Sequence, residues 1–274
     1  MTKWVQAIRQ TTTYLGVVMI AVIWSGVVLL ASQEHERAHE DAVRQGSNLT
    51  RVLEEYVQRI VQQSDNVLLA LRRDYQRDPE HFDMGNWMTR TQFHNNLTAH
   101  IGITDANGFV ILSSRGTLSA PVYVGDRTPF MFQRDHAGDQ LFISDPVVGG
   151  VSKELSVQFT RRFDKPDGTF DGTVAISLNV AEIERFFSSL DLGAAGMVSL
   201  VHADGVVLAR GGRDAGGRRF AGMKVNDTPL LHVLQRNPAG SYWNLPATTR
   251  QFDRVSRLIS ASVFRARGAL SFAM

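Results

Sequence analysis

Apolar and polar positions alternate with the period of a β-strand in two stretches of the middle of the chain. In the first stretch, the apolar runs flank Asn107-Gly108, a dipeptide that strongly favours a tight hairpin turn. In the second, residues 154–163 and 172–179 flank Pro166-Asp167-Gly168, whose side chains suit a turn. The pattern therefore predicts two hairpins that belong to a mainly antiparallel sheet.

The preceding segment, residues 33–76, has the spacing of a helix. Its apolar residues recur three, four or seven positions apart, and charged residues occupy the other faces. Asp78-Pro79 ends this helix, since proline disfavours helix at the residue before it. For the stripe of Leu49, Leu53, Tyr56 and Ile60 we expect two roles, in different halves of the helix: packing on a sheet, and pairing with a second chain in a homodimer.

The N-terminal segment carries a long apolar run. Residues 14–32 contain no charge and supply about the 20 residues that a bilayer requires, and Lys3 and Arg9 precede them. A cleaved signal peptide would have a shorter apolar core and a better cleavage site than Ala31-Ser32-Gln33. The run predicts an uncleaved transmembrane helix, with residues 1–13 in the cytoplasm and the bulk of the chain outside.

A second hairpin pattern lies about a hundred residues after the first. Residues 196–210 repeat the order of residues 101–113: an apolar strand, a polar turn that ends in glycine, and another apolar strand. A short amphipathic helix, 180–190, separates the copies, and a helix near 228–235 and strands near 240–244 and 255–264 complete the second. We predict an α+β fold with two modules, 77–190 and 191–265, and a C-terminal tail at 266–274.

Composition and motifs narrow the function. The chain is 43% apolar and 20% charged with a formal net charge of +2, and it has no basic stripe typical of a nucleic-acid-binding protein. It has no cysteine, which excludes disulfides and cysteine-bearing zinc sites. His81, His94 and His100 lack the spacing of a helical metal site, so we predict no metal and no cofactor. None of the common hydrolase, nucleotide-binding or zinc-protease motifs occurs, and we predict that the chain is not an enzyme.

Several short motifs, in this order and spacing, together resemble the double Cache (PAS-like) sensor domains of bacterial histidine kinases, diguanylate cyclases and chemoreceptors. The resemblance covers about residues 33–264 and rests on Ile103-Thr-Asp-Ala-Asn-Gly108, Asp126-Arg127-x-x-Phe130, Ile143-Ser-Asp-Pro-Val147, Ser152-Lys153, Thr160-Arg161-Arg162, Asp171-Gly-Thr-Val-Ala175, Arg185-Phe-Phe-Ser-Ser-Leu190 and Gly240-Ser-Tyr-Trp243. Relatives often carry tryptophan where Leu155 stands.

The resemblance implies that the membrane-distal module binds a small molecule and that the proximal module relays the signal. It implies a single-pass protein of the bacterial inner membrane, with a carboxylate or amino acid as ligand. Relatives continue into a second membrane helix and a cytoplasmic output domain, whereas this sequence stops at Met274 with neither. The alternative is a truncated, non-catalytic fragment that acts only as a dimerisation module.

The predicted site lies among polar residues between the two hairpins and on the second one. Arg127 and Arg161 could hold a carboxylate, since a guanidinium offers a planar fork of donors, and Asp126 could bind an amine. The same charges could instead form structural ion pairs. The candidate ligand-binding residues are Asp126, Arg127, Phe130, His136, Lys153, Arg161, Ser177 and Asn179.

Overall fold

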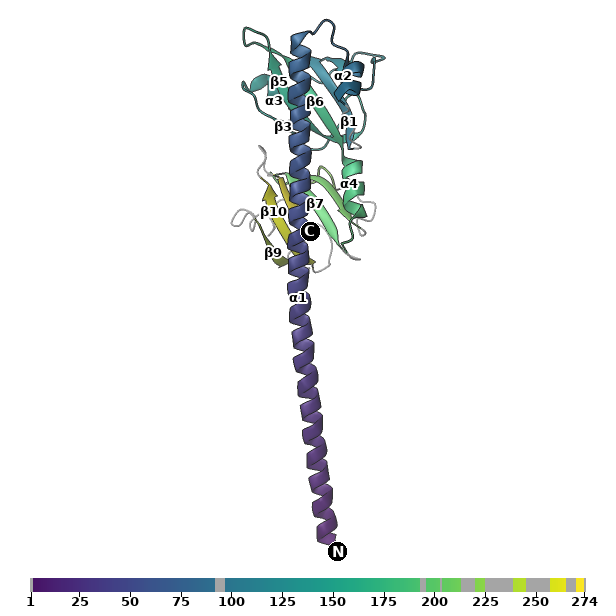
Figure 1. The fold of residues 1–274 in the computed structure, drawn as a ribbon, viewed down its shortest axis with the longest axis vertical. Helices are drawn as coiled ribbons and strands as arrows, with labels where there is room; N and C mark the ends of the chain where they lie inside the picture. Colours follow the sequence, from purple (N-terminus) through teal and green to yellow (C-terminus); the bar gives the residue numbers. More distant parts are fainter. Residues whose placement is uncertain are drawn as a thin grey trace. The chain divides into compact units, whose positions relative to one another are not determined.

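The computed structural model describes residues 2–91, 97–192, 196–202, 204–212, 220–224, 239–244, 257–264 and 270–273. The chain divides into two compact units, Met1–Gly46 and Ser47–Met274. Helix α1 (Thr2–Arg77) forms the described part of the first unit and continues into the second (Figure 1). Residues 33–76, which the sequence predicts to be helical, lie within α1, and the helix ends one residue before Asp78-Pro79.

The N-terminal part of α1 was predicted to cross a membrane. Residues 14–32 are helical, and the described apolar side chains here, including Ile23 and Trp24, are exposed. Across the described residues, no helix is both long enough and apolar enough to cross a bilayer. The membrane anchor is therefore not confirmed.

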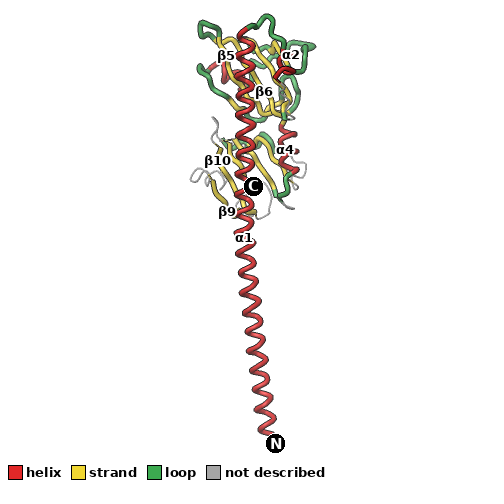
Figure 2. Tube along the Cα trace, viewed as in Figure 1, coloured by secondary structure: helices red, strands yellow, loops and turns green. Residues whose placement is uncertain are grey.

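A six-stranded antiparallel sheet contains both hairpins predicted from the strand pattern. Its strand order is β2-β1-β6-β5-β3, and β4 also pairs with β5. The strands are β1 (Thr98–Asp105), β2 (Val110–Ser113), β3 (Phe142–Ile143), β4 (Val147–Val148), β5 (Leu155–Asp164) and β6 (Phe170–Asn179). Figure 2 shows α1 running across this sheet.

The spacing of apolar residues did not predict two short helices that accompany this sheet. Helix α2 (Met84–Thr91) buries Trp87, whose indole N–H donates to Asp74 of α1 at 3.0 Å. Helix α3 (Thr128–Asp135) begins at the predicted ligand loop, with Pro129 in its first turn, where a missing backbone N–H costs nothing. An eight-residue helix spans about two turns, which is too short for a periodic pattern to be distinctive.

The second module repeats the first hairpin, as the sequence predicts. Strands β7 (Met197–His202) and β8 (Val207–Gly212) form an antiparallel pair with a register shift near the turn, like β1 and β2. Gly108 and Gly205 occupy equivalent turn positions with φ of 88°, a conformation that favours glycine. The predicted helix at 180–190 is α4 (Val180–Ser189).

The C-terminal residues form a strand rather than only a tail. Strands β9 (Ala239–Asn244) and β10 (Arg257–Phe264) agree with the predicted strands, and β11 (Leu270–Ala273) lies between β7 and β10 in the order β8-β7-β11-β10-β9. With only four residues, β11 gives too short an alternation to predict. The helix expected near 228–235 lies outside the described residues.

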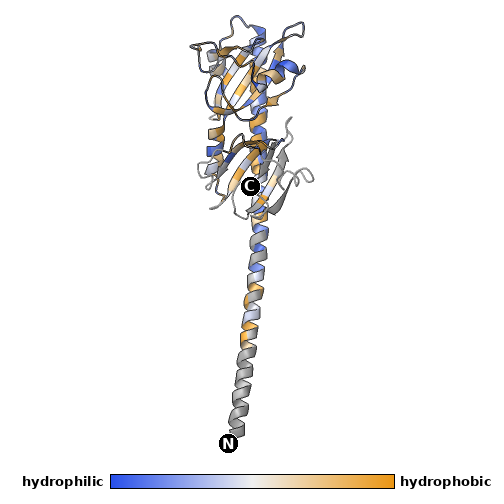
Figure 3. Cartoon of the chain, turned by 180° about the vertical axis from the view of Figure 1, so that it is seen from behind, coloured by the Kyte–Doolittle hydropathy of each residue, from blue (hydrophilic) through white to orange (hydrophobic). Residues whose placement is uncertain are grey.

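The larger of two apolar clusters in the described part of the second unit extends over both sheets. Leu53, Val57, Val61, Leu68 and Leu71 of α1 pack in a single cluster with both sheets and α4. Figure 3 shows hydrophobic residues gathered along the strands of the sheets. The β5–β6 register places Val157, Phe159 and Arg161 opposite Leu178, Ile176 and Val174 on the face toward α1. The alternate residues therefore point to the opposite face.

Candidate functional site

A cavity of about 50 Å³ lies on the face of the first sheet that points away from α1. Strand alternation determines much of its wall, since the residues of β1, β5 and β6 that face away from α1 line it. The lining includes His100, Thr104, Arg127, Phe130, Gln158, Thr173 and Ser177.

Part of this wall is already hydrogen-bonded within the chain. The hydroxyls of Thr104 and Thr173 lie 2.8 Å apart, and the backbone N–H of Thr173 also donates to Thr104 Oγ1. Gln133 of α3 fixes the neighbouring Thr160, because its amide donates to the Thr160 carbonyl at 2.7 Å. These groups form a rigid wall rather than a free donor set.

Two polar side chains in the wall have no such partner. In the part of the chain that the structure describes, neither Ser177 Oγ nor the side-chain amide of Gln158 makes a hydrogen bond. Both residues line the cavity, and Ser177 is only 3% exposed. A hydroxyl and an amide together offer donors and acceptors that a ligand can use.

Arg127 brings positive charge to the cavity. It immediately precedes α3 and is half-buried, and Nη1 donates to the carbonyl of Val148. The other guanidinium N–H groups make no hydrogen bond to a described residue. The backbone contact holds the guanidinium at the cavity while leaving donors for a carboxylate.

His100 is a wall residue that the sequence analysis did not include in the site. Its Nε2 lies 3.1 Å from Ser113 Oγ, and burial, reinforced by the charge of Arg115, lowers its pKa from 6.5 to about 4. The imidazole is therefore neutral at pH 7. A Cβ on Gly102 would lie 2.6 Å from His100 Cε1, so Gly102 makes room for the ring. The alternation of His100, Gly102 and Thr104 along β1 was the available signal.

The structure brings together three of the predicted site residues. Arg127, Phe130 and Ser177 all line the cavity, and the ring of Phe130 is buried against Phe170, with their centroids 5.5 Å apart. Asp126 is exposed and does not line it. Pairing a ligand amine with Asp126 inside this cavity is therefore not supported by its position.

Three other predicted residues lie away from the cavity wall. His136 stacks on Phe132 with the centroids 4.3 Å apart, and its Nδ1 contacts the Phe132 carbonyl oxygen at 3.0 Å. Lys153 adopts a positive φ of 60° in the loop before β5. Asn179 caps α4, since Oδ1 accepts from the Ala181 N–H at 2.8 Å while Nδ2 donates to Glu154.

The position of Arg161 differs from the prediction. We expected it at the rim of the same space as Ser177, but the register places Val174, not Ser177, beside it. Its side chain points toward α1, where Nη2 donates to Asp65 Oδ2 at 2.9 Å and Nη1 pairs with Asp139. The guanidinium is only 8% exposed and is held by two carboxylates. Arg127 and Arg161 therefore do not converge on one cavity.

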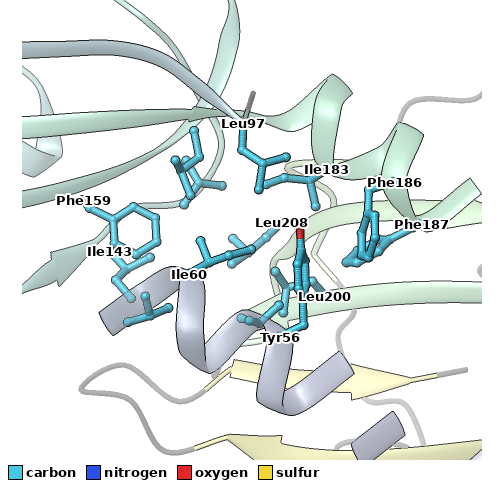
Figure 4. A pocket seen from close by; sticks show the side chains of 14 residues that line it. Tyr56, Ile60, Leu97, Ile143, Phe159, Ile183, Phe186, Phe187, Leu200 and Leu208 are labelled. Carbon is cyan, nitrogen blue, oxygen red and sulfur yellow. The ribbon is translucent and has the colours of Figure 1, made fainter. Parts of the chain in front are cut away.

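A second cavity, of about 30 Å³, lies between the two sheets and is almost wholly apolar (Figure 4). Tyr56 and Ile60 of α1 line it with residues of α4 and both sheets, and the Tyr56 ring stacks on Phe186 at 4.5 Å between centroids. The stripe expected to pair with a second chain is therefore packed within its own chain. Leu53, at 1% exposure, leads to the same conclusion.

The predicted absence of a metal site was based on three histidines, and two of them are described. His81 pairs with Asp78 at 2.9 Å and His100 with Ser113, while His94 lies outside the described residues. Elsewhere among the described residues, ligand atoms of Asp145, His202 and Asp204 lie within 4.8 Å of one another. Within this cluster His202 Nδ1 and Asp204 Oδ1 form a contact of 2.8 Å.

Comparisons with known proteins support the double Cache interpretation. Residues 181–267 match the family model dCache_1_like, described as a histidine kinase sensor domain. The extracellular domain of rpHK1S-Z16, which is named as a histidine kinase, is 23% identical with a TM-score of 0.72, over 86% of this chain and 94% of that one. No curated protein matches the sequence.

Two chemoreceptor domains share the fold at lower identity. The ligand-binding domain of the Pseudomonas aeruginosa amino acid chemoreceptor PctC, solved with GABA, is 13% identical with a TM-score of 0.59, over 85% of this chain and 98% of that one. That of Campylobacter jejuni Tlp3, solved with 4-methylisoleucine, is 12% identical with a TM-score of 0.56, over 86% and 91%. The family model covers residues 181–267, and the solved structures share the fold of this chain, which agrees with the resemblance to double Cache domains seen in the sequence.

Proposed function

We propose that this chain is a sensor that binds a small solute, a carboxylate or an amino acid, in the cavity beside Arg127. One observation carries the proposal. A guanidinium with spare donors and two polar side chains without partners among the described residues meet at one partly open cavity. These donors and acceptors face the cavity and are available to hydrogen-bond a polar ligand there.

The chemistry of the wall suits a carboxylate with a short apolar body. The guanidinium would bind the carboxylate through its planar fork, and Ser177 and Gln158 would hydrogen-bond the remaining polar atoms. Phe130 and Ala175 supply apolar contact. Solved neighbours in complex with GABA, 4-methylisoleucine and asparagine give an independent reason to test amino acids.

We propose further that ligand binding is signalled through α1 to an anchor at residues 14–32, with the sensor on the outer face of the bacterial inner membrane. The support is continuity, since the α1 residues that pack on the first sheet and those that pack near α4 belong to one helix and one core cluster. A ligand would shift this arrangement only through its different affinity for two states. A homodimer stays a prediction, and its interface requires residues other than the buried stripe.

Thermal shift of the full chain with acetate, propionate, butyrate, alanine and 4-aminobutyrate tests binding. A ligand at a hundred times its Kd stabilises the folded state by about 2.7 kcal/mol, which is readily measured. Arg127→Gln should abolish the shift. Arg134→Gln is the matched control, because Arg134 lies on α3, is exposed and pairs with Asp135. A flat response of the unmodified chain to every compound would contradict the proposal.

Topology can be tested with a single cysteine, because the chain has none of its own. Ser119 is exposed in the loop after β2, so Ser119→Cys changes one atom on the surface. A membrane-impermeant maleimide should label this cysteine in intact spheroplasts. Labelling only after permeabilisation would contradict an external sensor.

A further inference from the structure

We infer that the cavity selects small carboxylic acids that lack an amino group over the corresponding amino acids. The inference rests on the proposed function, since it names the class of ligand for the same site. The wall of the cavity can accommodate a carboxylate but not an ammonium group, because a positive charge lines the cavity and no negative charge does.

The cavity contains positive charge and no negative charge. Seventeen described residues line it, and Arg127 is the charged one among them, with no aspartate or glutamate. Among the acidic residues close to lining positions in the sequence, Asp105 Oδ1 accepts from the backbone N–H groups of Asn107 and Phe109, and Asp171 does not line the cavity. Asp126 is exposed, and Glu154 contacts Arg115 at 3.2 Å and Asn179 at 2.7 Å.

An ammonium group would therefore enter this cavity without a counter-charge. Removing a cation from water is costly unless a charged or strongly hydrogen-bonding partner replaces the hydration shell. Here the guanidinium of Arg127 would also repel it, because the two like charges would share one small cavity. Ser177 and Gln158 offer only neutral oxygens as acceptors.

A carboxylate without an amine meets no such cost. Its charge is matched by Arg127, and its carbon chain lies against Phe130 and Ala175. The volume of the cavity favours ligands with few heavy atoms, such as acetate, propionate and butyrate. The wall thus complements the carboxylate of an amino acid but offers no counter-charge for its ammonium group.

The experiment compares acids that differ only in the amine, using the full chain and isothermal titration. The pairs are propionate with alanine, and butyrate with 4-aminobutyrate. In each pair, we expect the acid without the amine to bind at least tenfold more tightly. Equal affinity, or tighter binding of the amino acid, would overturn the inference while leaving the proposed function in place.

A change of specificity provides the sharper test. Gln158→Glu keeps the size of the side chain and adds the missing negative charge, because Gln158 lines the cavity and its amide has no partner among the described residues. We expect this variant to lose affinity for propionate and to gain affinity for alanine, so that the ratio falls at least tenfold. Gln62→Glu is the matched control, since Gln62 is exposed on α1, which packs on the opposite face of the sheet.

A second variant covers the case in which Gln158→Glu does not fold. Ser177→Asp adds a carboxylate at another wall position that has no hydrogen bond among the described residues. An unchanged ratio of propionate to alanine affinity in a folded variant would overturn the inference. If neither member of any pair binds the unmodified chain, the proposed function fails and the inference fails with it, which is a distinct result.

Discussion

His100 should make the stability of this domain fall as the solution is acidified from pH 7 to pH 5. Its pKa is lowered from 6.5 to about 4, first by burial and then by the charge of Arg115. Between these two values the unfolded chain binds a proton that the folded chain does not. The folded state therefore has its full stability from this group above pH 6.5 and loses it as the pH falls toward 4.

The size of the effect follows from the gap between the two pKa values. The value of pH 5 is about 1.5 units below the pKa of the imidazole in the unfolded chain, and each unit corresponds to about 1.36 kcal/mol of protonation free energy. The folded imidazole is still mainly neutral there, so His100 should cost about 2 kcal/mol of the free energy of unfolding. Asp139, whose pKa is lowered to about 2 mainly by its hydrogen bond from Arg72, is ionised across this window and does not contribute.

Urea unfolding at pH 7 and pH 5, followed by circular dichroism, measures this loss. His100→Gln is the matched variant, because its amide can still contact Ser113 but does not titrate. The difference between pH 7 and pH 5 should be smaller in the variant by about 2 kcal/mol. The same pH dependence in both proteins would refute the assignment of the effect to a buried, neutral imidazole.

Three substitutions test other parts of the fold. Asn179→Ala should cost about 1 kcal/mol in urea unfolding, because it removes the side-chain cap of α4, and an unchanged midpoint would contradict this role. Asp65→Asn should lower the free energy of unfolding by about 2 kcal/mol, since the nearly buried Arg161 would lose one of its two carboxylate partners. A pH-independent loss of ligand binding without destabilisation would instead favour a ligand site at Arg161. Gly102→Ala should destabilise by about 1–3 kcal/mol, because its methyl group would meet the ring of His100, and thermal denaturation as stable as that of the unmodified chain would contradict the close contact.

The sequence by itself determined the elements whose signals are local. Asn107-Gly108 and residues 166–168 located the two hairpin turns of the first sheet, since glycine permits a positive φ there and proline fixes φ. The spacing of apolar residues gave α1 up to Arg77 and the helix α4. The repeat of the first hairpin near residues 196–210 correctly predicted the hairpin formed by β7 and β8.

Part of the candidate site was also accessible from the sequence. Arg127 and Phe130 were identified from a polar loop and Ser177 from the small side chains of one strand face, and all three line the cavity. The alternation of β6 was sufficient for this because side chains at every second position share a face. His100 obeys the same rule on β1 but was considered only as a metal ligand.

Only the tertiary structure decided how these elements combine. The face of β5 that carries Arg161 depends on its register with β6, and each strand pattern taken alone leaves that register open. Likewise, β11 pairs not only with β10, which precedes it in the sequence, but also with β7, which lies far from it in the sequence. The sequence also leaves open whether the apolar stripe on α1 packs on the sheets of its own chain or on a second chain. The answer depends on contacts between distant segments, whereas hydrophobic periodicity records only which residues share a face.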